Sequence, residues 1–302
     1  MTLLNSFLAK TLPFIPKPIV GKVSSRYIAG TLLSDAVNVV KGLNAEGTMT
    51  TLDILGEDVH EHDKAEAVKA EWMRVLEEIE RNRLDSNISV KPSQLGFRID
   101  LDYCYNNLRS LVEAARAKGN FVRIDMEDST MTTSTIWLYT RLREEGFENV
   151  GIVIQAYLHR SDADVRQLAR MKANIRICKG IYRESPEIAY QERDEIRRNF
   201  GLLLRVMIEN GCSVGIATHD KYLVEKAYEL IQKANLPKER YEFQMLLGVR
   251  EQLRRSIIAD GHRLRVYVPF GEQWYAYSVR RLKENPQIAG YVLKALLTGN
   301  NT

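Results

Sequence analysis

The chain is poor in the features that mark secreted and membrane-spanning proteins. Its three cysteines, Cys104, Cys178 and Cys212, lie far apart and form no C-x-x-C pair, so we expect neither a disulfide framework nor a zinc site. No apolar run approaches the roughly 18 residues that a membrane span needs. Residues 1–15 contain apolar side chains but no basic start and no small-residue cleavage site, which argues against a secretory signal. We therefore expect a cytoplasmic protein.

The charge balance argues against a nucleic-acid-binding protein. Lys and Arg total 43 and Asp and Glu total 39, and the resulting net charge of +4 is spread without a long basic block. This balance is too weak to indicate nucleic acid binding. With 45% hydrophobic and 27% charged residues, the 302-residue chain has an ordinary globular composition and is long enough for one large domain or two medium ones.

Several common nucleotide, metal and hydrolase motifs are also missing. There is no G-x-G-x-x-G and no G-x-x-x-x-G-K-[ST], so neither a Rossmann nor a P-loop nucleotide site is indicated. Neither H-E-x-x-H nor G-x-S-x-G occurs. His60 and His62 flank Glu61, but residues two apart on a helix point to different sides. We therefore interpret this tripeptide as the solvated start of a helix and expect no metal.

A regular alternation of strand-like and helix-like segments starts near Thr48. Strands are expected at residues 48–54, 87–91, 121–126, 151–157, 175–179, 212–217, 241–246 and 264–268, the last ended by Pro269 and Gly271. Helices are expected between them at residues 60–82, 102–117, 132–145, 162–171, 191–209, 221–234 and 250–259, with an eighth starting near Gln273. Eight such α/β units favour a parallel sheet closed into a (β/α)8 TIM-like barrel. A doubly wound open sheet is the alternative fold.

The two ends of the chain fall outside this alternation. Pro13, Pro16 and Pro18 interrupt the first part, and residues 29–43 have the pattern of an amphipathic helix. We therefore divide the chain into an N-terminal helical segment (1–45), a catalytic barrel (46–285) and a C-terminal helical tail (286–302). The amphipathic stretches 1–15 and 288–297 either pack on the barrel or contact a membrane surface.

Polar side chains gather at the C-terminal ends of the predicted strands, where barrel enzymes carry their active sites. They are Asp53, Lys91, Asp125, Glu127, Asp128, Gln155, Tyr157, Arg176, Lys179, Tyr182, Thr218, His219, Asp220, Gln244 and Tyr267. Barrel rims are always polar, but Arg176 and Lys179 alternate with isoleucines in or just beyond a short apolar strand, and buried cations need partners. We therefore favour a functional site. His219 is placed to act as a base or to hydrogen-bond a cofactor.

The helix that follows the last strand carries a second candidate site. Arg280 and Arg281 are adjacent, Tyr277 precedes them by one turn, and Glu284 follows both within one turn. Arginine forks bind carboxylates in a bidentate way, and a neighbouring glutamate can hold one fork in place. This pattern favours a carboxylate clamp, and a solvated helix face with an ordinary Glu–Arg pair is the alternative.

Six motifs in order along the strand ends give the chain a family resemblance. They are V-R-I-D-M-E-D at 122–128, V-I-Q-A-Y at 153–157, R-I-C-K-G-I-Y at 176–182, A-T-H-D at 217–220, E-F-Q-M-L-L-G at 242–248, and Y-V-P-F-G at 267–271 followed by R-R-L-K-E at 280–284. Each is weak alone, but together they resemble the FAD-dependent proline dehydrogenases, in their small, single-function bacterial form. The resemblance covers nearly the whole barrel. It implies a distorted (β/α)8 barrel whose eighth helix lies over the barrel mouth.

The resemblance also implies roles for individual residues. Asp125 would stand beside the ring nitrogen of proline, and Arg176 would lie near the reactive edge of the flavin. The proline carboxylate would be bound by Arg280 and Arg281, with Lys91 near it and Glu284 paired to the arginine helix. The walls of the substrate pocket would be Tyr182, Leu246, Tyr267 and Tyr277. FAD would be contacted by Met126, Gln155, Lys179, Gly180, Ile181, Thr218 and His219. Ile181 stands where relatives often have alanine, and we infer no change of substrate from it.

The implied reaction suits these residues, because flavin supplies the hydride chemistry and the protein has only to bind, orient and exclude water. The resemblance implies that L-proline is oxidised to pyrroline-5-carboxylate and that the electrons pass from FAD to a membrane quinone. It further implies peripheral contact with the inner face of the membrane and functional coupling to pyrroline-5-carboxylate dehydrogenase. The alternatives are another barrel flavoenzyme acting on a small amino or imino acid, a lyase with the same clamp, and a non-catalytic module that binds a carboxylate.

Overall fold

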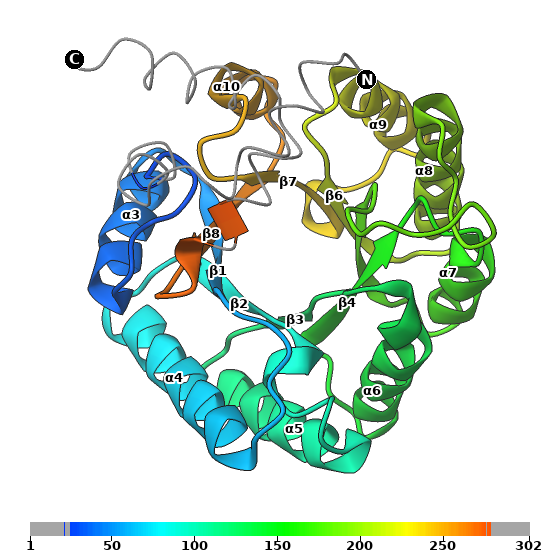
Figure 1. Ribbon diagram of the computed structural model, residues 1–302. Helices are drawn as coiled ribbons and strands as arrows, with labels where there is room; N and C mark the ends of the chain where they lie inside the picture. The colour runs from blue at the N-terminus through cyan, green and yellow to red at the C-terminus, as the bar shows by residue number, and fades with distance from the viewer. Residues whose placement is uncertain (1–20, 22–24, 276, 279–302) are drawn as a thin grey trace, which may run out of the picture.

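Eight parallel strands close into a barrel in the order of the chain, β1 to β8 (Figure 1). This computed structural model describes residues 21, 25–275, 277 and 278. β1 pairs in parallel with both β2 and β8, which closes the sheet. The open doubly wound sheet is therefore wrong, and the predicted (β/α)8 barrel is confirmed. The strands are β1 (Met49–Ile54), β2 (Ser86–Val90), β3 (Val122–Ile124), β4 (Val150–Gln155), β5 (Asn174–Cys178), β6 (Ser213–Ala217), β7 (Tyr241–Leu246) and β8 (Leu264–Phe270).

Helices form a ring around the strands (Figure 1). They cover the barrel with apolar side chains three or four residues apart, as α4 does with its buried Trp72, Val75, Leu76 and Ile79. β4 is buried along its whole length, as expected of a parallel strand that is covered by helices. The helices are α3 (Leu33–Ala45), α4 (His62–Arg81), α5 (Leu101–Ala117), α6 (Thr132–Glu144), α7 (Ser161–Ala169), α8 (Arg193–Glu209), α9 (Lys221–Lys233) and α10 (Glu251–Ala259), with short 3-10 turns η2 (Pro92–Gln94), η3 (Ser129–Met131) and η4 (Lys238–Arg240).

β8 runs further than the sequence predicts, and the expected break at Pro269 is wrong. The pairing of β8 with β7 ends where Leu246 faces Tyr267, whereas its pairing with β1 continues to Phe270. Proline has no N–H to donate. On the side of β7 this costs no hydrogen bond between strands, because β7 has already ended at Leu246. The Pro269 carbonyl instead accepts a hydrogen bond from the Ala29 N–H at 2.9 Å, which attaches the N-terminal segment to the strand.

The eighth helix begins after β8, as predicted near Gln273, and only its start is described. Trp274, Tyr275, Tyr277 and Ser278 are helical, and Ser278 Oγ donates to the Trp274 carbonyl at 2.7 Å. The remainder lies outside the described residues, and so do Arg280, Arg281, Glu284 and the amphipathic stretches 1–15 and 288–297. None of the helices within the described part of the chain is long and apolar enough to cross a membrane.

Candidate active site

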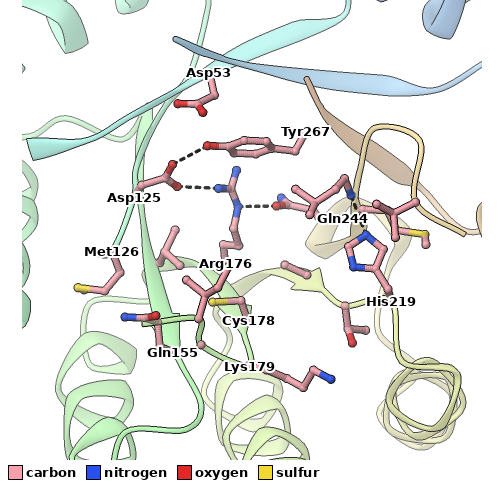
Figure 2. Close-up of a pocket in the computed structure, with 18 of the residues that line it drawn as sticks. Asp53, Asp125, Met126, Gln155, Arg176, Cys178, Lys179, His219, Gln244 and Tyr267 are labelled. Carbon is pink, nitrogen blue, oxygen red and sulfur yellow. Dashed lines mark hydrogen bonds and ion pairs between the residues drawn. The ribbon is translucent and has the colours of Figure 1, made fainter. Parts of the chain in front are cut away.

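A cavity of about 1180 Å³ opens at the C-terminal ends of the strands, and each strand end contributes to its lining. Every residue to which the family resemblance gives a role and which lies in the described part of the chain lines it, and Figure 2 shows how several of them lie. Two of the polar strand-end residues, Asp128 and Tyr157, do not line it. The structure thus brings the strand-end residues together around one cavity, while their individual roles stay predictions. These residues are Lys91, Asp125, Met126, Gln155, Arg176, Lys179, Gly180, Ile181, Tyr182, Thr218, His219, Leu246, Tyr267 and Tyr277.

Asp125 is the centre of the hydrogen-bond network in this cavity (Figure 2). It follows β3, which ends at Ile124, earlier than predicted. Its Oδ1 accepts from Ser89 Oγ and from Arg176 Nη1, each at 2.8 Å, and its Oδ2 accepts from the Tyr267 hydroxyl at 2.9 Å. Burial and the Asp125 charge raise the pKa of Tyr267 well above its usual value. Tyr267 is therefore a neutral donor at physiological pH, and both carboxylate oxygens are held in place.

Lys91 forms a second ion pair of the cavity, with the buried Asp53, beside the pair of Asp125 with Arg176. Asp53 is 1% exposed and the Lys91 side chain 13% exposed. Burial raises the pKa of Asp53, although Lys91 opposes this shift. Burial works against the Lys91 ammonium as well, but Asp53 and Asp125 outweigh it and raise the pKa of Lys91. Lys91 therefore stays positively charged in the cavity, where it can attract an anionic ligand.

The opposite side of the cavity presents oriented amide and imidazole groups. Gln155 Nε2 donates to the main-chain carbonyl of Glu127 at 2.8 Å, and the main-chain carbonyl of Gln155 accepts from Ser161 Oγ at 2.6 Å. His219 Nε2 accepts from the Leu246 N–H at 2.8 Å. Because Nε2 accepts, a neutral His219 carries its proton on Nδ1. The contact therefore decides which nitrogen of His219 is a donor.

Gly180 occupies a place where no other residue fits. Its φ is +108°, and a Cβ built there would lie 2.1 Å from Tyr157 Cδ1. The backbone after β5 therefore lines the cavity without a side chain at this point. Ile181, the next residue, is 40% exposed, so its larger side chain lies at the rim of the cavity.

Asp220 gathers three cations at the edge of the cavity. Arg197 donates to both carboxylate oxygens at 2.9 Å, and Lys179 and Arg193 each lie 3.5 Å from Oδ2. Burial works against the charged carboxylate, but Arg197 and Lys179 outweigh it and lower the pKa of Asp220 to about 2. Asp220 thus holds Lys179 and Arg193 beside the cavity.

We expect Asp220→Asn to destabilise the protein at neutral pH and to lose this effect in acid. A carboxylate whose folded pKa lies below the usual 3.8 contributes stability above that pH, and the contribution is lost as the pH falls toward about 2. The free energy of unfolding should drop by about 1–2 kcal/mol near neutrality, between the values for exposed and buried charged contacts. Urea unfolding at matched pH measures it. A difference that stays constant in acid would mean that Asp220 acts through packing.

Sequence reasoning missed several residues that build this cavity. Ser89 lies inside β2, and no motif signals its contact with Asp125. Ser93 is another, and it donates its N–H at 2.9 Å and its Oγ at 2.5 Å to Glu127, which the sequence did place at a strand end. Tyr27 reaches the cavity from the N-terminal segment. Such contacts depend on tertiary geometry, which local patterns do not contain.

Comparison with known proteins agrees with this architecture. The family model for proline dehydrogenase matches residues 36–293. The chain is 34% identical to proline dehydrogenase 1 of Bacillus subtilis subsp. natto over 90% of each chain, and 32% identical to proline dehydrogenase of Deinococcus radiodurans over 92% of this chain and 91% of that one.

Solved structures are similar in fold. The crystal structure of proline utilization A (PutA) from Bdellovibrio bacteriovorus inactivated by N-propargylglycine superposes with a TM-score of 0.83 at 28% identity and covers 87% of this chain. The chain spans only 32% of the length of that protein. The match to the family model and the identity over nearly the full length of the Bacillus and Deinococcus proteins show that the chain belongs to the proline dehydrogenase family of oxidoreductases.

Proposed function

We propose that this chain oxidises L-proline to 1-pyrroline-5-carboxylate with noncovalently bound FAD and that the electrons then pass to a membrane quinone. The observation that carries the proposal is the set of polar side chains on the cavity wall, the buried Asp125 and Arg176 with the partly buried Tyr267 and Lys91, in a chain of this family. The product is a cyclic imine that a pyrroline-5-carboxylate dehydrogenase would oxidise further, so functional coupling to such an enzyme is part of the proposal.

The cavity fits a flavin. Its volume of about 1180 Å³ exceeds the roughly 300–1,000 Å³ of ordinary ligand pockets, so a large cofactor and a small substrate have room together. The side-chain-free surface at Gly180 lets a flat group approach the backbone after β5. We assign the holding of FAD to Met126, Gln155, Lys179, Gly180, Ile181, Thr218 and His219. When bound, FAD supplies the hydride acceptor that the oxidation of a C–N bond requires.

The residues around Asp125 suit the binding of a cyclic amino acid. Lys91 keeps its positive charge in a partly buried position and can attract the carboxylate of proline. Asp125, already held by Arg176 and Tyr267, can accept a hydrogen bond from the ring nitrogen. We propose that Arg280 and Arg281 bind the carboxylate and that Glu284 pairs with them, on the basis of the sequence.

Apolar and aromatic side chains complete the proposed substrate pocket. Tyr277 is 8% exposed and lines the cavity, as do Leu246 and Tyr182. We propose that these side chains exclude water from the reacting carbon, since hydride transfer depends on close contact and alignment and needs no strong base.

Anaerobic addition of L-proline is expected to bleach the flavin absorbance of the purified protein. A quinone in liposomes should restore the absorbance, and NAD should not, because no dinucleotide-binding motif is present. Acid precipitation should release the flavin, because we propose no covalent attachment. The peripheral membrane contact is tested with liposomes that contain or lack quinone. It is also tested with chains that lack residues 1–15 or 288–297.

The outcomes separate the candidate functions. A colourless protein that binds proline without turnover would be a binding module, and a yellow protein that proline does not bleach would be another flavoenzyme. Flavin that stays with the acid precipitate would contradict noncovalent binding. If deletion of either terminal stretch leaves liposome binding and quinone turnover unchanged, that stretch does not contact the membrane.

A further inference from the structure

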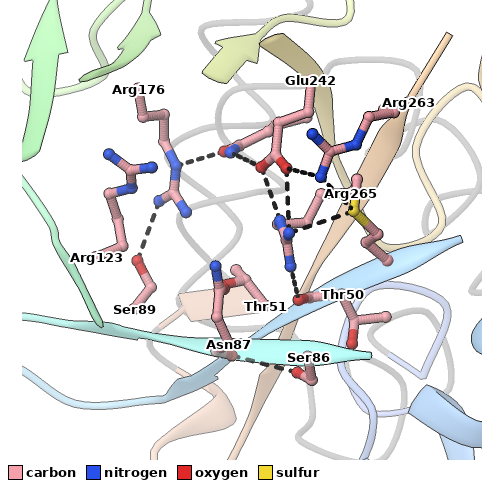
Figure 3. Close-up of polar contacts among 12 residues, drawn as sticks. Thr50, Thr51, Ser86, Asn87, Ser89, Arg123, Arg176, Glu242, Arg263 and Arg265 are labelled. Carbon is pink, nitrogen blue, oxygen red and sulfur yellow. Dashed lines mark hydrogen bonds and ion pairs between the residues drawn. The ribbon is translucent and has the colours of Figure 1, made fainter. Parts of the chain in front are cut away.

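A series of hydrogen-bonded polar side chains runs from the cavity wall into the barrel interior (Figure 3). Arg176 Nε donates to Gln244 Oε1 at 2.5 Å, and Gln244 Nε2 donates to Glu242 Oε1 at 2.6 Å. Arg265 Nε donates to the same Glu242 oxygen at 2.7 Å, and its Nη1 donates to the Thr50 carbonyl of β1 at 2.6 Å. We call Arg176, Gln244, Glu242 and Arg265 the interior relay.

β7 supplies the middle of the interior relay because its side chains alternate between two faces. Glu242 and Gln244 reach arginines inside the barrel, whereas Phe243 contacts Tyr228 of α9 on the outer side. Arg176 and Gln244 are each 6% exposed and Arg265 is 9% exposed. Buried polar groups are costly unless they are paired, so each hydrogen bond of the relay constrains its neighbours.

Gln244 has only one orientation that satisfies both of its partners. An arginine Nε only donates and a carboxylate only accepts, so the amide must turn its oxygen to Arg176 and its nitrogen to Glu242. Burial works against the Glu242 carboxylate, but Arg265, Gln244 and Arg123 together outweigh burial and lower the pKa of Glu242. Glu242 therefore remains charged at neutral pH and continues to accept. Glu242, which does not line the cavity, thus determines the orientation of the Gln244 amide.

The contact with Gln244 restrains the guanidinium plane of Arg176. Arg176 Nη1 donates to Asp125 at 2.8 Å and to Ser89 at 3.1 Å. Both bonds start from Nη1, so by themselves they leave the guanidinium plane free to rotate about that atom. The bond from Nε to Gln244 removes that freedom. The guanidinium carbon also lies 5.4 Å from the centroid of the Tyr267 ring.

We propose that Gln244 and Glu242 are positioning residues for the reaction, because together they fix the guanidinium plane of Arg176 and, through it, the carboxylate of Asp125. This inference rests on the proposed function, in which Arg176 lies near the reactive edge of the flavin and Asp125 beside the ring nitrogen. Glu242 takes part only through Gln244, so its role is one of orientation and not of contact with the substrate.

Gln244→Leu removes both bonds of the amide at similar volume. We expect it to lower kcat for proline by about tenfold to a hundredfold, since a hydrogen bond to a charged group is lost, and to leave KM within about threefold. The double variant Glu242→Gln with Gln244→Glu keeps the total charge and keeps an acceptor for Arg176 Nε at position 244, while the bond between positions 242 and 244 reverses its direction. We expect it to recover kcat to within about threefold of the parent.

Asn174→Ala is the matched control for a merely structural effect. Asn174 Oδ1 accepts from Arg123 Nη2 at 2.6 Å in the same barrel interior, outside the interior relay. The control variant should keep kcat even where its melting temperature falls. The second readout is the Nε–H resonance of Arg176 in the holoenzyme labelled with ¹⁵N-arginine. It should shift and exchange faster in Gln244→Leu and return in the double variant.

Three results would overturn the inference: kcat of Gln244→Leu within about twofold of the parent, a double variant as slow as Gln244→Leu, or an equal loss in Asn174→Ala. A failure of the proposed function is distinguishable, because the parent chain would then not be bleached by proline. The Nε–H resonance would in that case decide alone whether Gln244 and Glu242 fix Arg176, and an unchanged resonance in Gln244→Leu would show that they do not.

Discussion

Asp125→Ala is expected to lower kcat for proline by about a hundredfold or more while FAD stays bound. The carboxylate accepts from Ser89 and Arg176 at 2.8 Å and from Tyr267 at 2.9 Å, so its loss frees three donors at once. A hydrogen bond to a charged group contributes about 1.5–3 kcal/mol, and about 3 kcal/mol corresponds to two orders of magnitude in rate. Anaerobic stopped-flow bleaching of the flavin by proline measures the affected step.

Asp125→Asn is the matched control for this prediction. Asparagine keeps the size and one acceptor oxygen but loses the charge, so it separates the charge of Asp125 from its geometry. Removing one partner of a buried ion pair costs about 3–5 kcal/mol of stability, and unfolding must therefore be followed in parallel. If both variants release flavin or unfold at the assay temperature, Asp125 is structural and its assignment beside the ring nitrogen is wrong.

The barrel could be predicted because each of its elements carries its own local signal. β4 is a short apolar run that is buried throughout, and α4 repeats apolar residues at helical spacing. Eight such alternations leave few ways to cover both faces of a parallel sheet, and the pairing of β1 with β8 is one of them. The residues at which strands end were harder to predict from the sequence. β8, for example, continues past Pro269 only because β7 has already ended there.

The pairing of charges inside the cavity could not be predicted in the same way. The pattern places Asp53, Lys91, Asp125 and Arg176 at strand ends, but it does not say which carboxylate binds which cation. In the structure Asp125 binds Arg176 and Asp53 binds Lys91. These choices depend on side-chain reach across the barrel. The partners Asp125 and Tyr267 are 142 positions apart in the chain, so no local pattern connects them.

The inward position of Glu242 and Gln244 was within reach of the sequence, because both alternate with Phe243 and Met245 along β7. What local patterns cannot supply is the direction of each hydrogen bond. That direction follows from the arginines on both sides, which come from β5 and β8. The barrel therefore assembles a directed chain from residues that each look like ordinary strand positions.

Arg280→Met and Arg281→Met are each expected to raise KM for proline by about tenfold to a few hundredfold. Both arginines lie outside the described residues, but Tyr277, which is three and four positions before them in the sequence, lines the cavity. Side chains of adjacent residues on a helix leave the axis about 100° apart, so two forks can approach a carboxylate from different directions. Glu284 can neutralise only one of the charges, which leaves positive charge for the ligand.

Two experiments test whether these arginines bind a carboxylate in a bidentate way: substitution by lysine, and the use of prolinamide as a substrate. Arg→Lys at either position keeps the charge but loses the bidentate geometry, so we expect only partial rescue. Prolinamide lacks the carboxylate and should be a poor substrate of the parent. Its KM should also differ much less between the parent and the Arg→Met variants than the KM for proline does. If both methionine variants keep KM within about twofold of the parent, a shift under roughly 0.5 kcal/mol, the clamp is wrong, and the two arginines belong to a solvated helix face.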